Sequence, residues 1–295
     1  MKSKEVIIFG EVLFDCFPDG NIVLGGAPFN VAWHLQAFGV SPLFISAIGN
    51  DSYGDKIKEA MSEWGMSLSG LQTNPNYQTG VVSIEFINNE PHYDIVQNSA
   101  YDFIEFSSLP ELKKDSILYH GSLALRNEKS ATTLKEIKAN ISPSIFLDIN
   151  LRKPWWNIEN IKSLLKKTSW LKLNQEELLL IIPEKNDLQS KIDYLFSCFP
   201  LIENITVTQG AAGAISFQNK GIIEKIKPSQ TTKVIDTVGA GDAFSSILLL
   251  GIIKGWQLSK TLIRAQEFAS AIVGIQGATI NDKKFYDSFL TKWMN

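Results

Sequence analysis

The chain has 295 residues, of which 44% are hydrophobic and 20% charged, and this composition excludes a disordered or fibrous protein. Its 28 Lys and Arg residues against 31 Asp and Glu residues give a net charge of -3, which excludes a broad positive field for binding nucleic acid or an anionic membrane. The N-terminal apolar run is interrupted at Glu11 and Asp15, and the longest apolar stretch, residues 247–253, is much shorter than the about 20 residues that cross a bilayer, so we expect a cytoplasmic protein with no membrane partner.

Continuous apolar runs alternate with helical patterns along most of the chain. The runs that predict buried strands cover residues 6–10, 43–49, 116–122, 144–150 and 205–210. Strands that are apolar on both sides are typical of a parallel sheet with helices on both faces. The sequence therefore predicts an α/β fold with a mostly parallel central sheet, whose ligands bind at the carboxyl ends of the strands.

Residues 78–97 break this rhythm, because apolar and polar residues alternate on both sides of a turn at residues 88–91. The alternation predicts a hairpin with one exposed face. With the short run at residues 21–24, the hairpin would form a small sheet projecting as a lid; an antiparallel extension of the main sheet is the alternative. Because no Pro/Gly/Ser-rich linker divides the chain, we expect one domain over residues 1–295. The expected lid comprises approximately residues 12–24 and 71–98.

The most informative segment is residues 233–251, KVIDTVGAGDAFSSILLLG, which reads as a short β-like run, a Gly-Ala-Gly turn and an apolar helix. Backbone N–H groups at a helix N-terminus and the positive end of the helix dipole form an anion site, and Gly239 and Gly241 would let phosphate oxygens approach the main chain. A carboxylate is a poor phosphate ligand, so Asp242 is a candidate base for a hydroxyl that attacks phosphorus. The three C-terminal helices are expected over residues 240–254, 259–275 and 283–293.

Other interpretations of these glycine-rich segments compete with a phosphate site. A lone Asp after Gly is commonly a helix cap, although Asp236, Thr237 and two glycines nearby favour the phosphate site. The Gly-x-Gly at 239–241 begins a dinucleotide-binding fingerprint, but its third glycine position holds Phe244. Residues 49–56, GNDSYGDK, lack the Gly-Lys-Ser/Thr of a Walker A loop, so a P-loop kinase is not supported.

Two motifs resemble the signatures of one enzyme family. Residues 25–39, GGAPFNVAWHLQAFG, are similar to the N-terminal signature of the ribokinase-like (PfkB) sugar kinases, and residues 236–244, DTVGAGDAF, to their C-terminal signature. The motifs occur in the right order and at a suitable separation, and the resemblance runs nearly end to end. It implies a ribokinase-like three-layer sandwich with a β-sheet lid, and transfer of the terminal phosphate of ATP to a sugar hydroxyl with Mg²⁺ as a cofactor.

The resemblance also implies roles for individual residues. Asp242 would be the general base, and the amides of Gly239, Ala240 and Gly241 would stabilise the transferring phosphoryl group. The implied sugar-binding residues are Asp15, Gly25, Gly26, Asn30 and Arg152. The implied nucleotide-binding residues are Asn174, Thr208, Gly210 and Gly213, with Glu177 acting indirectly on magnesium. Some family members hold a potassium ion, and Asp236, Val238 and Gly277 would lie near it.

Simpler structural roles remain open for several of these residues. Asn174 and Glu177 have the spacing of a helix capping box, Gly25 and Gly26 fit a plain turn, residues 207–215 fit a Gly-rich hairpin, and Arg152 fits an exposed surface.

The acceptor is predicted from the subfamily that the motifs resemble. The GGAPFN form, together with DINLRKPWW at residues 148–156, is most similar to fructokinases, so conversion of fructose to fructose 6-phosphate is the leading hypothesis. Ribose, another hexose, 2-keto-3-deoxygluconate or a nucleoside are alternative acceptors. A non-catalytic sugar- or nucleotide-binding regulator and a nicotinamide-dependent oxidoreductase are alternative functions. The expected partners are a sugar and ATP, and the lid could also pair with a second copy in a homodimer.

Overall fold

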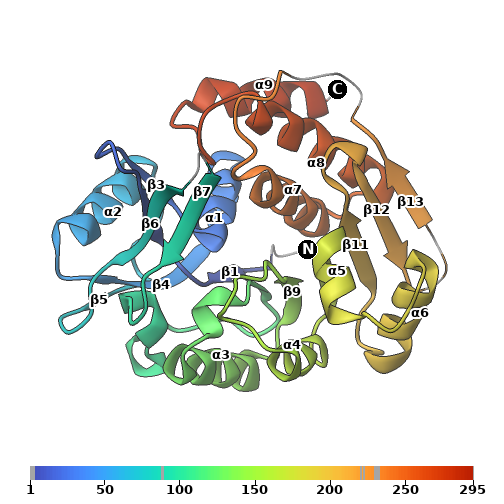
Figure 1. Cartoon of the computed structure of the whole chain (residues 1–295), viewed down its shortest axis with the longest axis horizontal. Coiled ribbons are helices and arrows are strands. Elements are labelled where there is room, and N and C mark those ends of the chain that lie inside the picture. The colour runs from blue at the N-terminus through green and yellow to red at the C-terminus, as the bar shows by residue number, and fades with distance from the viewer. Residues whose placement is uncertain (1–3, 88–89, 220, 222, 229–232, 295) are drawn as a thin grey trace.

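The computed structural model describes residues 4–87, 90–219, 221, 223–228 and 233–294 (Figure 1). Its large sheet is parallel from β5 to β11, and β12 and β13 continue it antiparallel at one edge. In spatial order its strands are β13 (Ile223–Ile226), β12 (Ala214–Gln218), β11 (Asn204–Thr208), β10 (Trp170–Asn174), β9 (Ser144–Asp148), β8 (Ile117–His120), β1 (Val6–Phe9), β4 (Leu43–Gly49) and β5 (Leu71–Asn74). The predicted strands are thus confirmed with small changes at their ends.

Helices cover both faces of this sheet, which gives the predicted three layers. Successive residues of β1 point to opposite faces: Ile8 joins the core under α1, α2, α7, α8 and α9, whereas Ile7 packs with residues of α3. A further core beside α4, α5 and α6 includes Leu147 and Leu171. The helices are α1 (Ala27–Ala37), α2 (Ser52–Glu63), α3 (Glu128–Ile141), α4 (Ile158–Leu165), α5 (Gln175–Ile181), α6 (Leu188–Cys198), α7 (Ala240–Lys254), α8 (Leu258–Val273) and α9 (Lys283–Met294).

A separate small sheet contains the predicted hairpin. Its strands are, in spatial order, β3 (Ile22–Gly25), β2 (Leu13–Cys16), β6 (Gly80–Ile87) and β7 (Glu90–Ile95). The strands β2 and β6 run parallel and the other pairs antiparallel, so the hairpin does not extend the large sheet. Residues 88 and 89 of the expected turn lie outside the described residues. The strand β5, which falls in the lid range expected from the sequence, pairs instead with β4 at the edge of the large sheet.

The segment before the Gly-Ala-Gly turn differs from the sequence prediction, because residues 233–235 do not form a strand. Val234 and Ile235 are 62% and 59% exposed, and the amides of Ile235 and Asp236 donate to the carbonyl of Val273 at the end of α8. This apolar run is therefore an exposed connection that is hydrogen-bonded to the end of a helix, and not a strand. In the described part of the chain, no helix is both long and apolar enough to span a membrane.

Phe268 lies at the centre of an aromatic cluster that joins α1, α8 and α9. It is fully buried, with ring centroids 5.0–6.2 Å from those of His34, Phe38, Phe285, Tyr286 and Phe289. We expect Phe268→Ala to lower the free energy of unfolding by about 3–5 kcal/mol, because it leaves a cavity that these rings cannot fill. Urea unfolding measures this loss.

The matched control for Phe268 is Ile263→Ala on the same helix. Ile263 is 56% exposed, so its truncation should change the free energy of unfolding by no more than about 0.5 kcal/mol. Equal losses in the two variants would contradict a central role for the Phe268 ring.

Candidate active site

The Gly-Ala-Gly turn lies at the N-terminus of α7, as the sequence predicts. Gly239 is the N-cap residue, with φ of +78°, and a Cβ atom there would lie 2.4 Å from the Cβ of Ala278. Both the conformation and the close approach therefore require glycine. Asp242 lies in the first turn of the helix and does not cap it, since the cap residue is Gly239. The amide of Ala240 donates to the carbonyl of Thr237, whereas N–H groups in the first turn of a helix generally lack a partner within the helix, so an anion site at this turn stays a prediction.

Asp242 is held from α1. The Asn30 side-chain amide donates to Oδ2 of Asp242 over 2.7 Å, although 212 residues separate the two in sequence. Burial, as the largest cause, raises the pKa of Asp242 to about 6, while the bond from Asn30 acts in the opposite direction. A carboxylate with this pKa is ionised at neutral pH and can still accept a proton readily.

Four of the predicted sugar-binding residues, Asp15, Gly25, Gly26 and Asn30, lie together near the connection from the large sheet to the small one. A Cβ atom on Gly25 would lie 3.6 Å from Oδ2 of Asp15 and 4.0 Å from Oδ1 of Asn30, so these three residues surround one space. Gly26 has φ of +109°, and a Cβ atom there would lie 2.6 Å from the carbonyl oxygen of Glu11. Burial raises the pKa of Asp15 to about 6, and the positive charge of the exposed Arg152 opposes this rise.

The sequence did not single out Glu11 as a site residue. It follows β1 and is buried, and Oε2 has no hydrogen-bond partner among the described residues. Burial raises its pKa to about 7, and the charges of Arg152 and Arg126 partly offset this rise. The sequence shows Glu11 between two predicted strands, but it does not show that the fold buries this carboxyl group.

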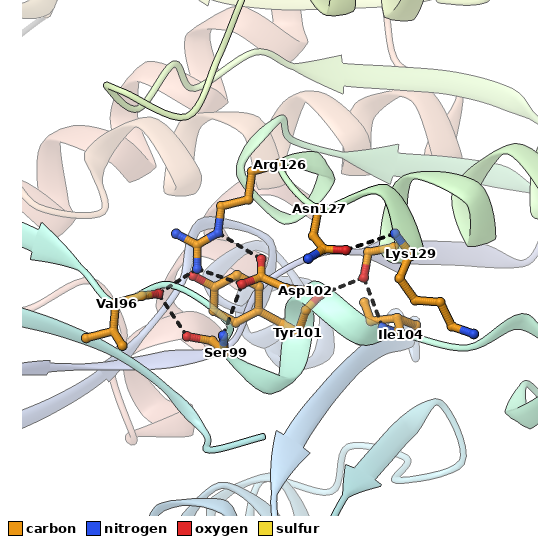
Figure 2. A network of polar contacts seen from close by, with 9 residues as sticks. Val96, Ser99, Tyr101, Asp102, Ile104, Arg126, Asn127 and Lys129 are labelled. Carbon is orange, nitrogen blue, oxygen red and sulfur yellow. Dashed lines mark hydrogen bonds and ion pairs between the residues drawn. The ribbon is translucent and has the colours of Figure 1, made fainter. Parts of the chain in front are cut away.

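A second unforeseen group is the network around Arg126 at the base of the small sheet, shown in Figure 2. Arg126 donates through Nε and Nη2 to the carboxylate of Asp102 over 2.8 Å each, and Nη2 also donates to the carbonyl of Val96, just after β7. Asp102 in turn accepts from the amide of Ser99. Both charged side chains are almost fully buried, at 5% and 2% exposure. The network therefore fixes the end of β7 to the segment that leads into α3.

Asn174 and Glu177 form a helix capping box, which is the simpler structural role that their spacing in the sequence allowed. Oδ1 of Asn174 accepts from the amide of Glu177 over 2.8 Å, and Oε2 of Glu177 accepts from the amide of Asn174 over 2.8 Å. The other oxygen of Glu177 accepts from the amide of Leu151. Each oxygen of Glu177 therefore already accepts one backbone amide, and its indirect role toward Mg²⁺ stays a prediction. Three or more His, Cys, Asp or Glu side chains do not gather into a metal-binding group anywhere in the described ranges.

The other predicted nucleotide-binding residues lie beside Asn174 at the carboxyl ends of β10 and β11. Thr208 is paired with Asn174 in the parallel register of these strands. Gly210 and Gly213 lie in the connection from β11 to β12, so residues 207–215 form the predicted hairpin. Gly210 faces open space, whereas a Cβ atom on Gly213 would lie 2.0 Å from the carbonyl oxygen of Ile226.

The carboxylate of Asp236 brings the three residues of the predicted potassium site together. It accepts from the amide of Val238 over 2.9 Å and from the amide of Gly277 over 3.0 Å. Each carboxylate oxygen retains lone-pair capacity for another partner. The three residues that the family resemblance assigns to a potassium site thus lie together, and the site itself stays a prediction.

A buried ion pair under the Gly-Ala-Gly turn was not foreseen either. Nζ of Lys172 on β10 lies 3.0 Å from both carboxylate oxygens of Asp148 on β9. Oδ2 of Asp148 also accepts from Ser245 of α7 over 2.6 Å and from Tyr119 of β8 over 3.1 Å. A lysine within the apolar run LKL at residues 171–173 was the only sequence signal of this pair.

The pKa of Asp242 leads to a prediction about pH, provided that Asp242 acts as a base. A base is active when deprotonated, so activity should fall as pH decreases through about 6, the folded-state pKa, instead of near the ordinary value of 3.8. The measurement is kcat/KM as a function of pH, with circular dichroism to show that the fold persists. A flat profile down to about pH 4 would contradict a base with a raised pKa.

Comparisons with known proteins agree with this architecture. A family model described as pfkB family carbohydrate kinase matches residues 16–284. The fructokinase of Salmonella typhimurium is 27% identical over 297 residues, which cover 94% of this chain and 95% of that protein.

Solved structures share the fold. The structure of fructokinase with bound ATP from Xylella fastidiosa superposes with a TM-score of 0.85 at 19% identity, covering 99% of this chain and 100% of that one. A double-mutant fructokinase from Vibrio cholerae, in a fructose-, ADP- and potassium-ion-bound form, gives a TM-score of 0.80 at 22% identity, with 94% and 95% of the two chains covered.

Proposed function

Because this chain belongs to the pfkB family of carbohydrate kinases, we propose that it transfers the terminal phosphate of ATP to a hydroxyl of fructose, giving fructose 6-phosphate. The observation that carries this proposal is the position of Asp242, which is hydrogen-bonded to Asn30 at the N-terminus of α7 directly after the Gly-Ala-Gly turn. A proton acceptor beside an anion site is the combination that attack of a hydroxyl on phosphorus requires.

In the proposed reaction the sugar lies in the space bounded by Asp15, Gly25 and Asn30. Its hydroxyl oxygen attacks the γ-phosphorus of ATP, and the hydroxyl proton passes to the Asp242 carboxylate. The bond from the γ-phosphorus to the bridging oxygen breaks as the new P–O bond forms, and ADP leaves with the bond electrons. The amides of the Gly-Ala-Gly turn stabilise the charge on the transferring group.

We propose that the nucleotide lies along the carboxyl ends of β10 and β11, near Asn174, Thr208, Gly210 and Gly213. The open space at Gly210 and the exposure of Asn174 support this position. Magnesium, when bound with the nucleotide, would offset phosphate charge, and Glu177 would act on it only through water.

We also propose a potassium site at Asp236, Val238 and Gly277. Their shared hydrogen bonds support it, and the potassium ion named for the Vibrio cholerae fructokinase is consistent with it. Exchange of potassium for a bulky organic cation at constant ionic strength would test it, with lower turnover as the supporting outcome.

Fructose is favoured by the GGAPFN and DINLR motifs and by the fructokinases among the relatives. The test is ADP release by the purified protein with ATP, Mg²⁺ and separate acceptors: fructose, ribose, another hexose, 2-keto-3-deoxygluconate and a nucleoside. Mass spectrometry and NMR of the product locate the new phosphate. The highest kcat/KM on fructose would support the proposal, and preference for another acceptor would replace the substrate while keeping the kinase.

A non-catalytic regulator remains the second hypothesis, because a shared fold does not guarantee catalysis. It predicts sugar or nucleotide binding, measured by calorimetry, without ADP release from any acceptor. The presence of both Asp242 and the Gly-Ala-Gly turn argues against it.

We further propose that the small sheet acts as a lid and that it carries the contact of a homodimer. The free edges of β3 and β7, and the 59% exposure of Tyr93, support an exposed pairing surface. Small-angle scattering with and without sugar and nucleotide tests closure, and analytical ultracentrifugation tests the dimer. Identical scattering profiles would contradict closure of the lid, and a monomer at all concentrations would contradict the homodimer.

A further inference from the structure

The ion pair of Lys172 and Asp148 is a buried charged group at the Gly-Ala-Gly turn for which the proposed reaction has no role. A Cβ atom on Gly241 would lie 3.3 Å from Nζ of Lys172, so the ammonium lies directly against the turn that would hold the phosphoryl group. The Lys172 side chain is only 9% exposed and that of Asp148 only 2%. Water screens this ion pair little, and its ammonium end lies against the turn, so the pair acts on the turn mainly through that positive end.

Asp148 fixes the position of that ammonium. Lys172 and Asp148 are register partners on β10 and β9, and Nζ contacts both carboxylate oxygens. Asp148 also accepts from Ser245, one turn after Asp242 on α7, so the same carboxylate ties α7 to the sheet. The hydroxyl of Tyr119 on β8 completes the set. The position of α7 and the position of the ammonium are therefore determined together.

Besides admitting phosphate oxygens, glycine at position 241 leaves room for the ammonium of Lys172. The φ of Gly241 is not positive, so the backbone conformation alone does not demand glycine. A side chain at this position would press against the ammonium of Lys172. The absence of a side chain lets the ammonium of Lys172 lie close to the backbone of the turn.

We propose that Lys172, held in place by Asp148, is a positioning residue for phosphoryl transfer, placing a positive charge under the Gly-Ala-Gly turn so that the turn binds the negatively charged phosphoryl group. This inference rests on the proposed kinase reaction. The developing charge on the phosphoryl oxygens is stabilised by fixed positive charge and dipoles that need no rearrangement during the reaction. Lys172 acts through the turn and Asp242 and contacts neither the sugar nor ATP.

Several charged groups act on Asp242 from the elements around it. Asp148 on β9 raises its pKa, while Lys172 on β10 and Arg152, after β9, lower it. Glu11 after β1 and Tyr119 on β8 are also within range of its charge. Burial alone would lower the pKa of Lys172, but the carboxylates, Asp148 first, raise it above its ordinary value, so the ammonium stays charged. Removing Lys172 alone should therefore make Asp242 harder to ionise.

The test compares three variants with the wild-type enzyme. Lys172→Met removes the charge, Lys172→Arg keeps it, and the double variant Lys172→Met, Asp148→Asn removes the pair without leaving a buried charge. We expect kcat to fall about tenfold to a hundredfold in Lys172→Met and in the double variant, and to recover largely in Lys172→Arg. The KM for the sugar should change much less than kcat. In Lys172→Met, the acid limb of the pH profile should move to higher pH.

Lys191→Met is the matched control. Lys191 is also a buried lysine, and Nζ donates to the carbonyl of Ile182 near the end of α5. This variant should lose stability, while kcat and the acid limb stay unchanged.

Each outcome decides the proposal. Unchanged kcat in the folded double variant would overturn it, as would an unshifted acid limb in a folded Lys172→Met enzyme. If Lys172→Met does not fold, the kcat values of the double variant and of Lys172→Arg decide whether the charge of Lys172 supports phosphoryl transfer. Absence of turnover in the wild type with every acceptor would instead count against the proposed kinase reaction, so the two failures are distinguishable.

Discussion

Asp242→Asn is expected to lower kcat by about a hundredfold to ten-thousandfold, because the amide cannot accept the proton of the attacking hydroxyl. The variant should keep the hydrogen bond that Asn30 donates to residue 242. An Asn side chain at 242 can accept this bond when its amide oxygen points toward Asn30. Nucleotide and sugar affinity should therefore change far less than kcat. ADP release at saturating substrate measures the first quantity, and titration calorimetry the second.

The control for this variant is Asp187→Asn. Asp187 is the N-cap residue of α6, where its carboxylate accepts from the amide of Ser190 over 2.9 Å. Asn caps helices about as well as Asp, so stability and kcat should both be preserved. If Asp242→Asn behaved like Asp187→Asn, Asp242 would have only a structural role at the helix start, and the regulator hypothesis would gain support.

Gly239→Ala is expected to lower kcat/KM by about a hundredfold or more, because it distorts the turn that supplies the phosphate-binding amides. The new Cβ would lie 2.4 Å from the Cβ of Ala278, and φ of +78° is unfavourable for alanine. The strained backbone should also cost roughly 1–3 kcal/mol of unfolding free energy, with the steric contact adding to it. Steady-state kinetics and urea unfolding measure the two effects.

Gly255→Ala separates strain from function. Gly255 ends α7 in the same left-handed conformation, with φ of +65°, and a Cβ atom there meets nothing within 4 Å. It should cost about 1–2 kcal/mol in stability without a change in kcat/KM. A similar kinetic loss in both variants would mean that general destabilisation of α7, and not the shape of the turn, reduces activity.

The sequence predicted those parts of the fold that are set by local patterns. Buried strands such as residues 43–49 and the helix at residues 240–254 follow from apolar composition and periodicity, and the glycine turn before Asp242 follows from spacing. The apolar run at residues 233–235 misled the prediction, because its composition suits a strand but its last residue, Ile235, bonds to the carbonyl of Val273 at the end of α8. Pairing between distant segments is not visible in local composition.

The charged part of the site was harder to predict for the same reason. Lys172 and Asp148 lie on different strands, and only their parallel register brings the ammonium to the carboxylate. Glu11 and Arg126 are likewise buried in the fold, and the local sequence around them does not show this burial. Asn174 and Glu177 show the opposite case, because a capping box is local in sequence and its two hydrogen bonds were foreseen as one interpretation.

The packing of α1 against α7 has a consequence for synthesis on the ribosome. The chain emerges from its N-terminus, so Asn30 of α1 is made 212 residues before its partner Asp242, and His34 of α1 is made 252 residues before its partner Tyr286 of α9. During that interval the apolar face of α1 has no native partner from the C-terminal helices, and it is exposed to misfolding or to chaperones. Nascent chains stalled before α7 should therefore be sensitive to protease around α1, whereas released full-length chains should not.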